Sequence, residues 1–201
     1  MAPRGHSADD VARTALRILD DHGLPDLTMR RLATALEVQP SALYWHFPNK
    51  QTLLAELSDR IVARMASGAA TDLRTEARAL RDALLTYRDG AEVVSSTLAL
   101  GLGAPLATDR LTAAVVADGF DAETAGRVAT TVLHYVLGFA WHEQQRLQYD
   151  SVGVRGKGAG AALRGANGAG AVDAGAAGLA SDDFAFGLDL IIAGLHARRR
   201  V

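Results

Sequence analysis

The chain has 201 residues, of which 49% are hydrophobic, and its formal net charge is −2. This length is enough for one good core or two small ones, with roughly two thirds of the unfolded surface buried. Because the chain contains no cysteine, disulfides, thiolate metal sites and cysteine nucleophiles are excluded together. The charge argues against a protein that coats nucleic acid nonspecifically, but one positive face is enough for binding at a specific site.

Targeting and membrane signals are missing from the sequence. It has no charged-then-apolar leader and no apolar run of about 18 residues, so neither secretion nor a membrane span is expected. The expected location is the cytoplasm. No strand-type alternation of useful length occurs either, and the fold is therefore predicted to be all-α.

The first predicted helix begins at Ser7, which forms a capping-box-like start with Asp10 three residues later. It ends at Gly23. Its apolar stripe consists of Val11, Ala15, Ile18 and Leu19. This helix is expected to brace the two helices that follow.

Two short helices around a tight turn come next. Thr28 can cap the first of them, whose apolar positions Leu32, Ala33 and Leu36 share one face. After a turn at residues 37–39, the second is predicted from Pro40, a residue tolerated in a first helical turn, to Phe47. Its inward residue is Leu43.

A fourth helix is predicted from the cap Asn49 to about Ser67, because Pro48 closes the preceding helix. Lys50 falls in its first turn, where the free amides and the positive dipole end suit a phosphate. Its inward positions are Leu53, Leu54, Leu57, Ile61, Val62 and Met65.

The rest of the chain is also predicted to be helical. Helices are expected near 71–87, 91–99, 106–118 and 121–147, the first ended by Asp89-Gly90 and the last capped by Asp121. Residues 151–181 are rich in Gly and Ala and are interpreted as a mobile linker. A final apolar helix follows from Ser181. Two mostly apolar helices late in the chain favour burial against a second copy.

The order of sequence motifs in the N-terminal part resembles that of the TetR family of bacterial repressors. The motifs are the capping Thr28, the run Leu43-Tyr44-Trp45-His46-Phe47, and Asn49-Lys50 with leucines at 53 and 54. The resemblance implies a helix-turn-helix DNA-binding domain at 1–48, a connecting helix at 49–67, and an effector-binding and dimerisation domain at 68–201 that includes the linker.

The resemblance also implies roles for individual residues at the DNA. Arg30 matches a base contact, with a solvated charge as the alternative. The recognition positions are matched by small residues, namely Pro40, Ser41 and Ala42. Contacts to the DNA backbone are matched by Tyr44, His46 and Lys50. Thr28 is expected both to cap its helix and to bind a phosphate. Trp45 is expected in the core. Glu37 stands where the family often has Gly, at a cost on the order of 1 kcal/mol if its φ is positive.

Residues 83–91, 137–145 and 184–195 resemble the effector-binding domain of the tetracycline-repressor subgroup. In that subgroup the helices matching 121–147 and 183–197 form a four-helix homodimer interface. The drug-binding positions match Ala66, Glu76, Val94 and His142 here. Because Ala and Val offer no polar side chain and His replaces an acidic residue, tetracycline is not the expected effector. The expected effector is a more hydrophobic small molecule.

Three residues of the long helix are the main candidates for polar groups of an effector pocket, namely His134, Tyr135 and Trp141. Glu76 and His142 are weaker ones. The alternative is that each is an ordinary packed or hydrogen-bonded helix residue. No catalytic group, metal site or cofactor is predicted, since the sequence shows no paired carboxylates, no metal-spaced His motif and no phosphate loop.

The function expected from these residues is that of a homodimeric, ligand-responsive repressor bound to a palindromic double-stranded DNA operator. An activator of the same fold remains an alternative, because the sequence does not separate activation from repression. The other alternative is an all-helical ligand carrier or enzyme.

Overall fold

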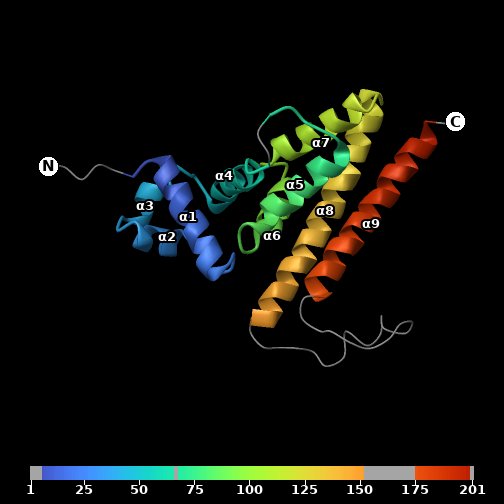
Figure 1. Ribbon diagram of the computed structural model, residues 1–201. Helices are drawn as coiled ribbons and strands as arrows, with labels where there is room; N and C mark the ends of the chain where they lie inside the picture. The colour runs from blue at the N-terminus through green and yellow to red at the C-terminus, as the bar shows by residue number, and fades with distance from the viewer. Residues whose placement is uncertain (1–5, 66–67, 152–174, 200–201) are drawn as a thin grey trace. The chain divides into compact units, whose positions relative to one another are not determined.

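The computed structural model describes residues 6–65, 68–151 and 175–199. Every regular element within these residues is a helix, which confirms the all-α prediction (Figure 1). The elements are α1 (Ala8–His22), α2 (Met29–Ala35), α3 (Pro40–Leu43), α4 (Lys50–Val62), α5 (Leu73–Leu85), α6 (Gly90–Ala99), α7 (Pro105–Ala117), α8 (Ala122–Ser151) and α9 (Gly175–Arg198). None of the described helices is long and apolar enough to cross a membrane.

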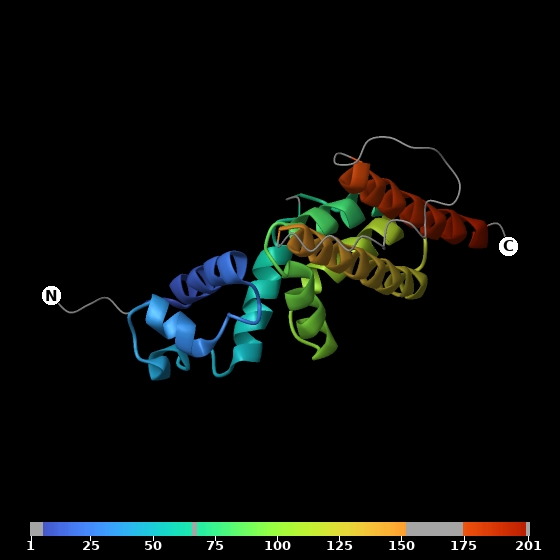
Figure 2. The ribbon, with the colours of Figure 1, turned by 90° about the horizontal axis from the view of Figure 1, so that it is seen from below.

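The chain divides into two compact units, Met1–Trp141 and His142–Val201. In the first unit, α4 lies between the N-terminal helices and the later ones in both views of the ribbon (Figures 1 and 2). It contacts α1 on one side and α5, α6 and α7 on the other. We call α1, α2 and α3 with their connecting turns, residues 7–49, the head. The domain borders predicted at residues 48 and 67 stay a prediction.

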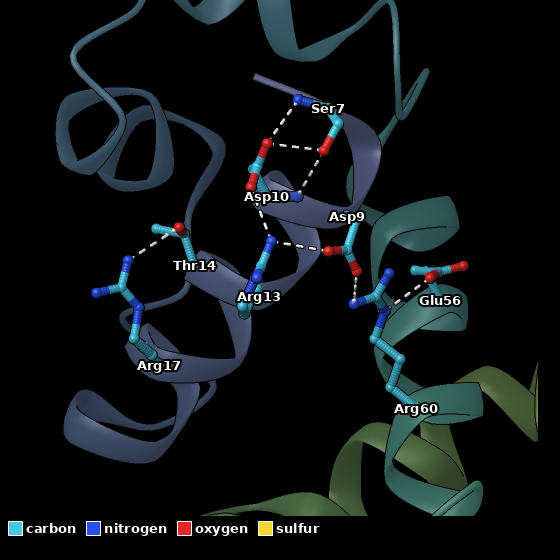
Figure 3. Close-up of polar contacts among 8 residues, drawn as sticks. All are labelled: Ser7, Asp9, Asp10, Arg13, Thr14, Arg17, Glu56 and Arg60. Carbon is cyan, nitrogen blue, oxygen red and sulfur yellow. Dashed lines mark hydrogen bonds and ion pairs between the residues drawn. The ribbon is translucent and has the colours of Figure 1, made fainter.

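The first helix forms as its sequence predicts. Ser7 Oγ accepts from the amide of Asp10 (3.2 Å), and Asp10 Oδ2 accepts from the amide of Ser7 (3.0 Å), so the capping box is complete (Figure 3). Gly23 ends the helix with φ 83°. Its buried apolar side chains are Val11, Ala12, Ala15, Leu16, Ile18 and Leu19.

The helix pair of the head also forms, with one difference in length. Thr28 Oγ1 accepts from the amide of Arg31 (3.1 Å) and caps α2. The predicted second helix is shorter than expected, since α3 ends at Leu43. The chain stays curled beyond it, because the amide of Phe47 still donates to the carbonyl of Leu43 (2.9 Å). The side chains of Leu43 and Phe47 are both buried.

The prediction that Trp45 belongs to the core is wrong. Its side chain is 89% exposed. Leu43 and Phe47, four residues apart, fall on the same side of a helical turn and fill the core between them. Trp45 lies midway between these two positions and therefore points to the opposite side.

Helix α4 begins at the predicted cap, where Asn49 Oδ1 accepts from the amide of Thr52 (2.9 Å). It ends at Val62, earlier than the predicted residue 67. The turn between α5 and α6 contains Asp89, whose φ of 57° explains the predicted break. Before α7 the chain again turns through left-handed residues, Gly101, Gly103 and Ala104.

The long helix α8 extends to Ser151, four residues past the predicted end at 147. Within the first unit its buried residues recur at steps of three and four and are Ala125, Ala129, Val132, Leu133, Val136, Leu137 and Ala140. Helix α9 begins at Gly175, before the predicted Ser181. Most of the predicted linker, residues 152–174, lies outside the described residues. On α9, Phe184, Leu188 and Leu195 are buried, while Phe186 and Leu190 are exposed.

Candidate DNA-binding surface

The beginning of α2 presents one open cation to solvent. Arg30 is exposed, and its guanidinium has no ion-pair partner within the described ranges. Its neighbour Arg31 is different, because its Nη1 lies 2.9 Å from Asp26 Oδ1. The positive charge that the sequence assigns to this region is therefore partly neutralised. Arg30 is the residue left to donate to a base or a phosphate.

The short helix α3 has an exposed face of small residues. Pro40, Ser41 and Ala42 are all exposed, while Leu43 points into the core. Since none of the three carries a long side chain, the backbone of α3 can come close to a second surface. A hydroxyl, a methyl and a proline ring suit contacts to base edges and to thymine methyl groups.

Gln39 belongs to this face, although sequence reasoning assigned it only to the turn. It is the N-cap of α3, it is exposed, and its side chain makes no capping hydrogen bond. A free amide of this kind can pair with two atoms of an adenine edge. The signal that could have found it is its position directly before Pro40, where the side chain is too long to cap efficiently.

Aromatic and basic residues follow α3 in the chain. Tyr44 is 48% exposed and His46 is exposed, on either side of the largely exposed Trp45 in the chain. Lys50 is the first residue of α4, at the end of the helix where free amides and the positive end of the dipole attract a phosphate. Hydroxyl, imidazole and ammonium groups between the end of α3 and the start of α4 suit contacts to DNA phosphates, which fix register without reading sequence.

The turn between α2 and α3 is tight and strained at one residue. Glu37 has φ 55°, so the condition for a strained residue is met at this position, where the family often has Gly. The amide of Val38 donates to the carbonyl of Ala33 (3.0 Å) and closes the turn. His6 Nε2 donates to the carbonyl of Leu36 (2.9 Å), so the residue before the N-cap of α1 is joined to the end of α2.

Glu76, one of the predicted effector contacts, is held in a buried ion pair. Its side chain is 2% exposed, and Arg110 binds it with Nε (2.7 Å) and Nη2 (2.9 Å). The amide and hydroxyl of Thr71 donate to the same carboxylate, and Arg110 Nη1 donates to the carbonyl of Gly68 (2.8 Å). Burial would raise the pKa of Glu76, but the hydrogen bonds from Arg110 and Thr71 outweigh it and lower the pKa. An effector that used Glu76 would have to break this pair.

The four other predicted effector contacts lie on α8. His134 is exposed, and its Nδ1 donates to the carbonyl of Thr130 in the same helix (2.7 Å). Tyr135 is half-buried with its ring 5.4 Å from that of Phe139. Trp141 is 41% exposed. His142 is exposed and begins the second unit.

The hydrogen bond of His134 and the ring contact of Tyr135 are both made within α8, as ordinary helix residues make them. The effector role of the four residues stays a prediction. Of the positions that match the tetracycline contacts, Val94 is fully buried. Ala66 lies outside the described residues.

A capped helix, a tight turn and a short helix with small outward residues together make a helix-turn-helix unit, which presents one helix to the DNA major groove. The fold and this surface define the class of an all-helical DNA-binding protein.

Comparison with known proteins identifies the family. The model for the bacterial regulatory proteins of the tetR family matches residues 12–57, and the model for the tetracyclin repressor-like C-terminal domain matches residues 66–199. The chain belongs to the TetR family of transcriptional regulators, which are not enzymes.

Individual relatives cover most of the chain. Tetracycline repressor protein class E of Escherichia coli is 36% identical over 153 residues, which is 72% of each protein. The crystal structure of Mycobacterium smegmatis BioQ superposes with a TM-score of 0.77 at 40% identity and covers 96% of this chain and 98% of its own. BioQ bound to its double-stranded DNA operator superposes with a TM-score of 0.70 at 37% identity, covering 96% and 99%.

Proposed function

We propose that the protein is a homodimeric repressor that places two copies of α3 in successive major grooves of a palindromic operator, about 34 to 36 Å apart. The observation that carries this proposal is the exposed face of α2 and α3, with an open Arg30 beside small side chains and the free amide of Gln39. The similarity to BioQ with its operator supports it. Such a protein would work in the cytoplasm, where bacterial DNA lies.

Specificity would come from Arg30, Gln39 and the three residues that begin α3. Thr28, Tyr44, His46 and Lys50 would bind phosphates and set the register. Trp45 joins this second group, since an exposed indole beside Tyr44 and His46 can pack against sugars of the DNA backbone. The net charge of −2 is compatible with this, because each head needs only a few cations.

A small hydrophobic molecule other than tetracycline would release the repressor from DNA. Two observations support this effector class: Val94 stands buried at a position where the tetracycline subgroup has a polar contact, and Glu76 is engaged by Arg110. The molecule must bind the two states of the protein with different affinity to shift their balance. Late apolar helices, with Phe186 and Leu190 exposed on α9, would form the dimer interface.

Selection of bound DNA from a random pool tests the proposal directly. The expected result is a palindrome whose binding weakens steeply with salt. Arg30→Ala should cost about 1–3 kcal/mol and relax specificity at one position of each half-site. Arg78→Ala removes an exposed arginine of α5 and serves as the matched control, with unchanged binding.

A reporter gene behind the recovered operator then gives the direction of regulation. Repression by the wild-type protein is expected. Recovery of no palindrome, or activation of the reporter, would contradict the proposal.

A further inference from the structure

The end of α1 and the turn between α5 and α6 are joined by two hydrogen bonds between segments 65 and 68 residues apart in sequence. The amide of Leu24 donates to Asp89 Oδ2 (2.8 Å). The amide of Arg88 donates to Asp20 Oδ1 (3.2 Å). Each bond joins a backbone amide of one segment to a carboxylate of the other. The head is thus attached to the helices after α4 at a second place besides α4 itself.

Helix α6 alone does not explain the conformation of Asp89. This residue is the N-cap of α6, a position where an aspartate ordinarily accepts from an amide of its own helix. Here it makes no such bond, and its φ of 57° is one that non-glycine residues adopt at a cost. The residue is only 6% exposed. Its carboxylate is directed away from its own helix and toward the amide of Leu24.

Gly23 leaves room for this carboxylate. Its φ of 83° is left-handed, and a Cβ at this position would lie 2.8 Å from Asp89 Oδ2 and 3.3 Å from Arg88 Nε. A glycine is therefore required here for two reasons, the ending of α1 and the close approach of Asp89. Any side chain at residue 23 would push the carboxylate away from the amide of Leu24.

These two hydrogen bonds fix the C-terminal end of α1, whose N-terminal end is already joined to α4. Near its beginning, Asp9 Oδ1 lies 2.6 Å from Arg60 Nη1, an ion pair between α1 and α4 (Figure 3). Helix α1 has 15 residues and is therefore about 22 Å long. A head held only at α4 could rotate about it, whereas a head held at both ends of α1 has one orientation.

From this geometry we infer that Asp89 is a positioning residue that sets the angle of the head, and through it the half-site spacing that the dimer accepts. This inference rests on the proposed function, because spacing has meaning only for two heads on one palindrome. One added base pair shifts a half-site by about 3.4 Å and rotates it by about 35° around the duplex. A fixed head cannot follow that change, but a loosened one can.

The test uses the full-length protein and the palindrome recovered by selection, with its half-sites at the native spacing or one base pair closer or farther. The wild type should lose affinity on the order of tenfold at either altered spacing. Asp89→Ala should bind the native operator more weakly and lose less than about threefold at the altered spacings. Gly23→Ala should behave in the same way, because it displaces the same carboxylate.

Two variants separate positioning from a merely structural effect. Asp89→Asn keeps an acceptor oxygen and a residue type that tolerates left-handed φ, so it should retain the spacing discrimination of the wild type. Asp21→Ala removes an exposed carboxylate near the end of α1, next to Asp20, and should change nothing. Circular dichroism establishes that each variant is folded, and if Asp89→Ala is not, Gly23→Ala takes its place.

Unchanged spacing discrimination in folded Asp89→Ala or Gly23→Ala would overturn the inference, even if the melting temperature falls. Recovery of no palindrome at all would instead count against the proposed function.

Discussion

Replacing Arg110 by Met should destabilise the protein strongly, because it leaves a carboxylate buried without its cation. The side chains of Glu76 and Arg110 are 2% and 11% exposed, and two hydrogen bonds of 2.7 and 2.9 Å join them. Removal of one partner from a buried pair of this kind costs about 3–5 kcal/mol. Arg110 also holds the carbonyl of Gly68, so the segment before α5 should loosen as well.

The assay is thermal and urea unfolding followed by circular dichroism. For a chain of this size the loss corresponds to a fall in melting temperature of about 2–4 °C for each kcal/mol. The double variant Glu76→Leu/Arg110→Met should recover most of the loss, because well-packed apolar side chains can replace a buried ion pair. If Arg110→Met costs less than about 1 kcal/mol, the pair behaves like a surface salt bridge and the reasoning is refuted.

The same pair predicts how stability depends on pH. The pKa of Glu76 is lowered in the folded protein. Its contribution is therefore fully present above the pKa of an unfolded glutamate, about 4.3, and is lost as the pH falls through the lower folded pKa. In Glu76→Gln, the free energy of unfolding should fall less steeply as the pH is lowered into the acid range. A profile identical to that of the wild type would contradict the assignment.

Four further changes test the head. Glu37→Gly should raise the free energy of unfolding by up to about 1 kcal/mol, since φ 55° strains a non-glycine residue; a lower melting temperature would argue against strain. Ser7→Ala should cost about 1 kcal/mol in urea unfolding through loss of the cap on Asp10, and no loss would mean that the helix end is frayed. In binding assays, Lys50→Ala should reduce the salt slope by about 1 without changing sequence preference. Gln39→Ala should change the sequence preference and leave the salt slope as it is.

Short-range rules were enough to predict much of the head. The caps at Ser7, Thr28 and Asn49 depend on residues at most three positions away, and each forms as predicted. The end of α1 at Gly23 is equally local.

What the sequence did not reveal depends on partners farther away or on competition for space. Arg110 meets Glu76 across 34 residues, and no local pattern indicates that pairing. Trp45 is expected in the core from the sequence, yet Leu43 and Phe47 occupy the inner side of that turn. The Asp26–Arg31 pair likewise reduces a charge that the sequence counts as free.

Because Trp45 is exposed, its intrinsic fluorescence can report on what covers the head. The chain has two tryptophans, and Trp45 is 89% exposed while Trp141 is 41% exposed. In a Trp141→Phe background, the fluorescence of the protein would therefore come from the surface proposed to face the operator. Acrylamide should quench that emission efficiently in the free protein and poorly once DNA covers the indole, so operator occupancy could be followed without a label.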